Sequence, residues 1–263
     1  MRLAGRSVSA GRGGGVALVS AKPMSFLGGV DPATGIVRDP ASDIRGECVA
    51  GRVLVFPSGK GSTVGSYVLY GLARHGVAPA AIVNERTETI VATGCILGGI
   101  PLVDRIDPTA ILTGDRVAVD GDAGAVELPD VIERRAATAF LRNRGRILIL
   151  KHGDTAPTFS GLWSAVSGSV EPTERPLARA RKEILEETAI RGARLVARGG
   201  PVFVRHDATV FVVFPFLFDV PTRQVRLDRE NTDARWVRPA ELPEYHTVPR
   251  LSDALAAVLP QGA

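Results

Sequence analysis

The sequence predicts an α/β fold in two domains, residues 1–129 and 130–263. The length of 263 residues suits one large domain or two ordinary domains of roughly 100–200 residues each. Short strand-like runs alternate with helical patterns in both halves, which is typical of α/β proteins. The segment Leu128-Pro-Asp130 separates two series of strands that do not repeat each other, so we expect two different domains.

In the first domain, a strand is expected around Val16 to Val19, followed by a turn-rich loop at 25–35. Arg52–Phe56 has the composition of a buried strand, and a glycine-rich loop at 57–65 leads into a helical apolar pattern. That pattern consists of Val68, Leu69, Leu72 and Ala73. Turn signals separate the further strands expected at 80–83, 100–103, 116–119 and 125–128.

The second domain restarts with its own strands. Two of them, at 137–141 and 146–150, are joined by a turn at 142–145. A helix is expected from Pro176 to about Thr188, because proline suits the first turn of a helix. The remaining elements are expected as strands at 202–204 and 210–218 and a closing helix at 251–258.

The composition excludes several classes of protein. Hydrophobic residues make up 45% and charged residues 23%, the balance of a soluble globular chain. The apolar run Val210–Phe218 is too short for a membrane helix. No cluster of five or six basic residues indicates a nucleic-acid partner. The two cysteines, Cys48 and Cys95, are too few for a disulfide scaffold or a self-contained metal cluster, which favours a reduced, cytoplasmic protein.

The loop after the strand at 52–56 is a candidate anion site. Backbone N–H groups and the dipole of the following helix favour an anion, and glycines let the backbone approach it. The candidate residues are Gly59, Lys60, Gly61, Ser62, Gly65 and Ser66. The spacing fits neither a P-loop nor, by one residue, a dinucleotide fingerprint. A glycine turn that only joins strand to helix stays open at this point.

Three blocks of the first domain, 25–35, 51–69 and 78–83, resemble the small swivelling-domain subunit of aconitase X enzymes. The archaeal members are phosphomevalonate dehydratases. The resemblance implies a swivelling β/β/α fold that forms a heterodimer with a large subunit, which carries the [4Fe-4S] cluster. It also implies dehydration of a small phosphorylated substrate, (R)-5-phosphomevalonate, to trans-anhydromevalonate 5-phosphate in the archaeal mevalonate pathway of isoprenoid biosynthesis.

In this family the proton acceptor is a serine of the glycine loop, and Ser62 matches it. A serine hydroxyl is a weak base, so its alkoxide has to be stabilised by N–H donors such as those at a helix start. Thr63 and Val64 stand where ordinary aconitases have a Ser-Arg pair that grips a carboxylate. Lys60 is therefore the candidate contact for the substrate's phosphate or carboxylate.

The predicted helix at 176–188 carries the most specific spacing of the sequence, Gly168-x₅-Glu174-x₇-Lys182-Glu183-Ile184-x-Glu186-Glu187-x-Ala189. On a helix, Glu183, Glu186 and Glu187 fall within about 100° of one another. They repel one another unless a divalent cation such as Mg²⁺ offsets their charge. By charge alone, a solvated helix with Arg179–Glu183 and Lys182–Glu186 ion pairs is the simpler interpretation.

The full spacing resembles the Nudix box, and residues 133–260 resemble an α/β/α Nudix sandwich. The resemblance implies hydrolysis of a diphosphate by metal-activated water, with Glu183 and Glu187 as Mg²⁺ ligands, Glu186 supporting and Glu174 behind them. Lys182 replaces the arginine of the box and lacks its planar fork. Ala189 replaces a glycine, which is unfavourable if that residue has positive φ. The aromatic residues Phe159, Trp163 and Phe203 line a pocket or, more simply, pack in the core.

Several functions stay open. The leading one is a dehydratase small subunit fused to a Nudix domain, with hydroxyproline dehydration as a variant within the same family. A second is a Mg²⁺-dependent Nudix hydrolase whose first domain is a docking module. A third is a non-catalytic sensor of isoprenoid diphosphates or nucleotides.

Overall fold

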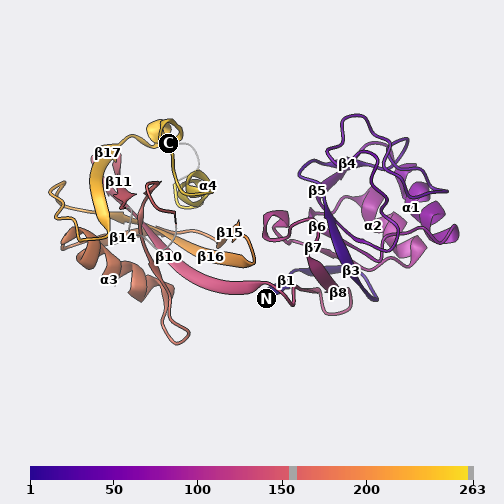
Figure 1. Cartoon of the computed structure of the whole chain (residues 1–263), viewed down its shortest axis with the longest axis horizontal. Coiled ribbons are helices and arrows are strands. Elements are labelled where there is room, and N and C mark those ends of the chain that lie inside the picture. Colours follow the sequence, from indigo (N-terminus) through magenta and orange to yellow (C-terminus); the bar gives the residue numbers. More distant parts are fainter. Residues whose placement is uncertain (154–158, 260–263) are drawn as a thin grey trace. The chain divides into compact units, whose positions relative to one another are not determined.

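The computed structural model describes residues 1–153 and 159–259, and the chain forms two compact units, Met1–Ile132 and Glu133–Ala263. Each unit has its own sheet and its own helices, which confirms the α/β fold class (Figure 1). The helices of the described residues are all too short or too polar to cross a membrane.

The first unit, all of which is described, contains a nine-stranded sheet. Its strands are β1 (Arg2–Ala4), β2 (Arg6–Ser9), β3 (Arg12–Val19), β4 (Met24–Ser25), β5 (Val53–Lys60), β6 (Ala81–Arg86), β7 (Leu102–Asp104), β8 (Arg116–Asp120) and β9 (Ala125–Glu127). They lie in the order β1-β9-β8-β3-β5-β6-β7-β2, with β4 beside β5. The central strands β3, β5, β6 and β7 are parallel, and the outer pairs are antiparallel.

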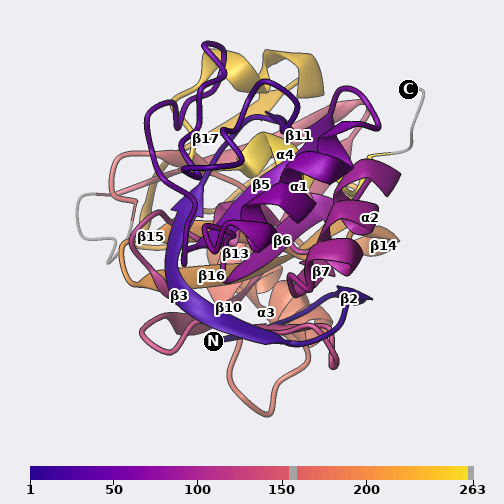
Figure 2. The ribbon, with the colours of Figure 1, turned by 90° about the vertical axis from the view of Figure 1, so that its right-hand side faces the viewer.

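Two helices, α1 (Gly65–Arg74) and α2 (Thr89–Gly98), lie side by side on this unit (Figure 2). Leu69 of α1 and Val91 of α2 are fully buried in one core with Leu54 of β5. The helices approach closely at Gly94, where an added Cβ would lie 2.7 Å from Leu69 Cβ. The helix α2 was not predicted from the sequence. A 3₁₀ turn, η1 (Pro108–Ala110), follows β7.

The glycine-rich segment after Phe56 differs from its prediction. Residues 57–60 were expected to begin the loop, whereas they continue β5 as far as Lys60. The reason is a long-range pairing, because β4 runs parallel to the end of β5 and pairs Met24 with Gly59 and Ser25 with Lys60. The loop that remains before α1 is therefore only four residues long, 61–64.

The second unit contains an eight-stranded sheet among its described residues. Its strands are β10 (Ile132–Asn143), β11 (Arg146–His152), β12 (Trp163–Ser164), β13 (Val166–Ser169), β14 (Arg194–Arg198), β15 (Val202–His206), β16 (Thr209–Asp219) and β17 (Asn231–Val237). The order is β12-β11-β10-β16-β14, while β13 pairs with β10, β15 with β16 and β17 with β11.

Helices cover both faces of this sheet: α3 (Pro176–Thr188) packs on one and α4 (Leu251–Ala256) on the other (Figure 1). Alternate residues of β11 point to opposite faces, so Ile147 belongs to the α4 core and Leu148 to the α3 core. This arrangement is the predicted α/β/α sandwich. A 3₁₀ segment, η2 (Pro239–Glu244), precedes α4, which ends two residues earlier than predicted.

Candidate functional site

The loop between β5 and α1 places Ser62 at the N-terminal end of α1. Gly61 turns the chain with a φ of +107°, and the helix begins at Gly65 after the N-cap residue Val64. The N–H of Val64 donates a hydrogen bond of 3.3 Å to Oγ of Ser62, whose side chain is exposed. An exposed oxygen at a helix N-terminus lies in a partial positive charge, which favours its anionic form.

Ser66 does not join Ser62 at the open side of the loop. It is 7% exposed, and its hydroxyl donates a hydrogen bond of 2.8 Å to the carbonyl of Thr63. The backbone N–H of Ser66 donates to the same carbonyl at 3.2 Å. This hydroxyl therefore closes the first turn of α1, unlike the expectation that it faces a substrate.

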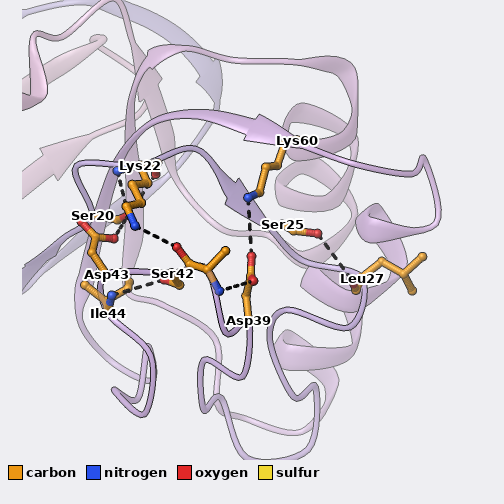
Figure 3. A network of polar contacts seen from close by, with 10 residues as sticks. Ser20, Lys22, Ser25, Leu27, Asp39, Ser42, Asp43, Ile44 and Lys60 are labelled. Atoms are coloured by element: carbon orange, nitrogen blue, oxygen red, sulfur yellow. Dashed lines mark hydrogen bonds and ion pairs between the residues drawn. The ribbon is translucent and has the colours of Figure 1, made fainter.

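Lys60 lies at a cavity of about 340 Å³ beside the end of β5. The lining residues are Ser25, Leu27, Gly28, Gly29, Asp39, Pro40 and Lys60. The Lys60 side chain points toward Asp39, and its Nζ lies 3.6 Å from Asp39 Oδ2 (Figure 3). Because the Lys60 side chain is still 47% exposed, it can also meet an anion from solvent.

Two of the predicted glycines, Gly59 and Gly65, lie so close to α2 that a side chain would have little room there. A Cβ added at Gly59 would lie 2.6 Å from Cγ2 of Val91, and one added at Gly65 would lie 3.1 Å from Cγ2 of Ile90. The N–H of Gly59 also donates a 2.6 Å hydrogen bond to Oε2 of Glu88, the N-cap residue of α2. Glu88 was not singled out from the sequence, because its role depends on α2, a helix that the sequence did not predict.

The second unit contains a cleft of about 470 Å³ that is lined by Gly168, Glu183, Glu186 and Glu187. Gly168 is next to the first of these carboxylates, since an added Cβ would lie 1.8 Å from Glu183 Oε1. Any side chain at this position would therefore displace Glu183. Among the predicted aromatics, Phe159 lines the cleft, whereas Trp163 belongs to the core on the α4 face.

Glu187 is the most deeply buried of the three carboxylates, with 6% exposed. The Ser167 N–H donates to its Oε1 at 2.9 Å, and Nδ2 of Asn231 donates to its Oε2 at 3.0 Å. Burial raises the pKa of Glu187 to about 8. Oδ1 of Asn231 is buried and has no hydrogen-bond partner among the described residues. Asn231 was not singled out from the sequence, because this first residue of β17 belongs to no recognisable spacing.

Arg179 connects two of the predicted acidic residues. Its Nε lies 2.8 Å from Glu174 Oε2 and its Nη1 lies 3.1 Å from Glu183 Oε1. Burial raises the pKa of Glu183. Lys182, at the arginine position of the spacing, instead pairs with Glu186 at 3.7 Å, and both side chains are more than half exposed. The two ion pairs expected for a charged helix are therefore present, but one of them holds Glu183 at the cleft.

The carboxylates fit a hard cation by their chemistry, although the described residues contain no ready group of three metal-ligating side chains. Glu183, Glu186 and Glu187 each have a protein partner instead, as expected for carboxylates that repel one another. Mg²⁺ prefers carboxylate oxygens, and the unpartnered Oδ1 of Asn231 is a further oxygen donor beside Glu187. Binding would require Glu186 to leave Lys182, whereas Glu183 can offer its other carboxylate oxygen and keep Oε1 on Arg179.

Comparison with known proteins assigns each unit. Residues 2–128 match the family model of the aconitase X swivel domain. The phosphomevalonate dehydratase small subunit of Thermococcus sibiricus is 58% identical over 130 residues, which are 49% of this chain and 100% of the relative. The chain belongs to the aconitase X swivel-domain family. The small subunit of Methanocaldococcus jannaschii is 57% identical over 128 residues, 49% of this chain and 98% of the relative.

The unit that follows the swivel domain is a NUDIX domain, since residues 132–258 match that family model. Both units thus belong to families of enzymes. Among solved structures, the aconitase X of Thermococcus kodakaraensis in its holo form is 55% identical, with a TM-score of 0.48 over 49% of this chain and 98% of that chain. A MutT protein of Methanosarcina mazei Go1 is 23% identical, with a TM-score of 0.43 over 48% of this chain and 93% of that chain.

The NUDIX domain has a strained residue at the end of α3. Ala189 has φ +57° and ψ +11°, in the left-handed region. Since that conformation costs an L-residue about 1–2 kcal/mol, we expect Ala189→Gly to raise the free energy of unfolding by about 1 kcal/mol. The control is Ala178→Gly at an exposed position inside α3, which should lower it by about 1 kcal/mol. Urea unfolding measures both, and a loss of stability in both variants would contradict the prediction.

Proposed function

We propose that the first unit is the small subunit of a phosphomevalonate dehydratase. The observation that carries this proposal is the exposed Ser62 hydroxyl at the N-terminus of α1, in a domain that aligns with the whole length of relatives so named. The partner is a large subunit, and the substrate is a small phosphorylated hydroxy acid. An iron–sulfur cluster on that subunit supplies a Lewis acid for the departing hydroxyl.

In this proposal, Ser62 Oγ accepts the proton that leaves the substrate's carbon. The N–H of Val64, 3.3 Å away, stabilises the developing alkoxide together with the partial charge of the helix. Lys60 binds an anionic group of the substrate at the cavity beside β5. Gly61 provides the turn between Lys60 and Ser62, because its positive φ suits glycine.

The test is reconstitution of the full chain with a candidate large subunit under anaerobic conditions. We expect a stable complex that forms the dehydrated product from 5-phosphomevalonate only when both chains are present. A complex that dehydrates hydroxyproline instead would identify the other activity of the aconitase X family. A chain that forms no complex with any candidate large subunit would favour a docking or sensing role for the first unit.

We propose a second activity for the NUDIX domain, the Mg²⁺-dependent hydrolysis of a diphosphate. It is supported by the deeply buried carboxylate of Glu187 beside an unpartnered carbonyl oxygen of Asn231, both in one cleft. Glu183, Glu186, Glu187 and Asn231 would hold the ion, which activates water and offsets phosphate charge. Magnesium-dependent phosphate release by the full chain tests this activity, and tight ligand binding without turnover would favour a sensor.

Arg179 is expected to be the cation that positions Glu183, in place of Lys182. Loss of a residue that orients a metal ligand typically lowers activity by about 10–100-fold, so we expect Arg179→Ala to lower the hydrolase kcat by that factor. The matched control is Lys182→Ala on the same helix. The ion pair of Lys182 with Glu186 is exposed, so this variant should lower kcat by less than about twofold. Magnesium titrations of both variants measure the effect, and equal losses would contradict the assignment.

A further inference from the structure

One part of the lining of the NUDIX cleft is apolar, in contrast to the part that carries the carboxylates. This apolar part is called the apolar wall below. β15, β16 and α4 contribute it through Val202, Val204, Phe211, Val213, Leu251 and Ala254. All six belong to or pack against the hydrophobic core on the α4 face of the sheet. One cavity therefore combines an anionic, metal-compatible set of residues with a surface of aliphatic and aromatic carbon.

Three of the four hydroxyl groups that line the same cleft, those of Thr138, Ser164 and Ser167, have protein partners. Ser164 Oγ lies 2.7 Å from Nε2 of His152 and donates to the carbonyl of Ala165 at 2.9 Å. Ser167 Oγ donates to the same carbonyl at 3.0 Å and lies 3.0 Å from Oγ1 of Thr138. A nucleobase or ribose placed beside these three hydroxyls would bring polar atoms to groups that are already satisfied, and unpartnered buried polar atoms oppose binding.

Arg250 also lines the cleft, and its guanidinium is engaged within the protein. Its Nε donates to Oδ2 of Asp253 at 2.7 Å, and its Nη1 donates to the carbonyl of Phe203 at 3.0 Å. These bonds connect the start of α4 to β15, the two elements that form the apolar wall. Arg250 therefore stabilises the wall, and its engaged groups do not favour recognition of a base edge.

We infer that the cleft takes an alkyl or prenyl diphosphate, with the diphosphate at the carboxylates and the aliphatic tail on the apolar wall. The inference rests on the proposed hydrolase and narrows its substrate to a class without a nucleoside. In the reaction, the oxygen of water bonds to phosphorus and the bond from phosphorus to the bridging oxygen breaks. The products are an alkyl monophosphate and inorganic phosphate, which takes up the proton released by water. The cavity of about 470 Å³ is within the ordinary size of small-molecule sites.

The first experiment compares three probes on the full chain with magnesium: 3-methylbutyl diphosphate, inorganic pyrophosphate and guanosine triphosphate. Each buried CH₂ group strengthens binding by about fourfold, so kcat/KM for the alkyl diphosphate should exceed that for pyrophosphate by at least about 10²-fold. It should also exceed that for the nucleotide. Preferential hydrolysis of guanosine triphosphate would overturn the inference and leave the hydrolase function intact.

The second experiment measures binding without turnover, which separates the two proposals. The non-hydrolysable probe is 3-methylbutyl methylenediphosphonate, and calorimetry should show that it binds with higher affinity than methylenediphosphonate, which lacks the alkyl tail. If this binding is found but no probe is hydrolysed, the substrate class is supported and the hydrolase function falls. Equal affinities for the two diphosphonates would overturn the inference.

A matched pair of variants tests whether the alkyl tail binds against the apolar wall. Val204→Thr adds a hydroxyl at a position that lines the cleft. It should lower the affinity for the alkyl diphosphonate by about tenfold, because burying an unpaired hydroxyl opposes binding. It should leave methylenediphosphonate unchanged. Val196→Thr, at an exposed position of β14 outside the cleft lining, should change neither. Unchanged alkyl affinity in a folded Val204→Thr protein would overturn the inference.

Discussion

Ser62→Ala is expected to lower the turnover of the reconstituted dehydratase by about 10²–10⁴-fold, the usual contribution of a positioned proton acceptor. The substrate KM should change much less, because Lys60 and the backbone of the loop remain. The Ser62 side chain is exposed and accepts one long hydrogen bond of 3.3 Å from Val64. Its removal should therefore alter the free energy of unfolding by no more than about 1 kcal/mol.

Thr63→Ala is the control for the Ser62 variant, since it removes an exposed hydroxyl from the neighbouring position of the same loop. It should retain turnover within about threefold, in line with the small effect of most exposed substitutions. Anaerobic kinetics of the complexes, together with thermal unfolding of each variant, separate loss of chemistry from loss of structure. Wild-type turnover with alanine at position 62 would remove this residue from the proton transfer and leave the partner assignment standing.

How far the sequence predicts the fold depends on the kind of signal each element carries. The helix α3 was predicted with its observed bounds, Pro176–Thr188, because a proline marks its start and its charged and apolar residues occupy separate faces. The helix α2 was missed because apolar side chains occur on both its buried and its exposed sides. Val91 is fully buried, whereas Ile96 is 61% exposed, so no single apolar face shows the helical period.

The site residues also differ in whether a local pattern of the sequence reveals them. Local spacing along α3 identified Glu183 and Glu187, since residues three and four apart share one face of a helix. Asn231 and the double role of Arg179 depend on contacts that spacing does not reveal. Asn231 lies 44 positions from Glu187 in the sequence, and Arg179 reaches Glu174 outside the helix as well as Glu183 within it. Similarly, the end of β5 looked like a loop because its pairing with β4 is long-range.

Glu187→Gln is expected to lower magnesium-dependent hydrolysis by at least about 100-fold, the upper range for loss of groups that tune a metal ligand. The amide keeps the size of the side chain and removes its negative charge. Glu244→Gln, at an exposed position of η2, is the control and should retain full hydrolysis. Magnesium titrations of phosphate release measure both variants. If Glu187→Gln kept the affinity and rate of the wild type, the buried carboxylate would not be a metal ligand.

The same variant should change how stability depends on pH in the absence of metal. Burial raises the pKa of Glu187 to about 8 from its ordinary value of 4.5, so the folded protein binds a proton more tightly than the unfolded chain. Stability from this group is therefore fully present below pH 4.5 and falls as the pH rises toward 8. Urea unfolding in EDTA at several pH values should show this fall in the wild type and a flatter profile in Glu187→Gln.

Added magnesium should reduce the loss of stability at high pH in the wild type, because a bound cation favours the ionised carboxylate. Parallel profiles for the two proteins in EDTA would show that Glu187 ionises normally in the fold, which would remove the electrostatic argument for a metal beside it.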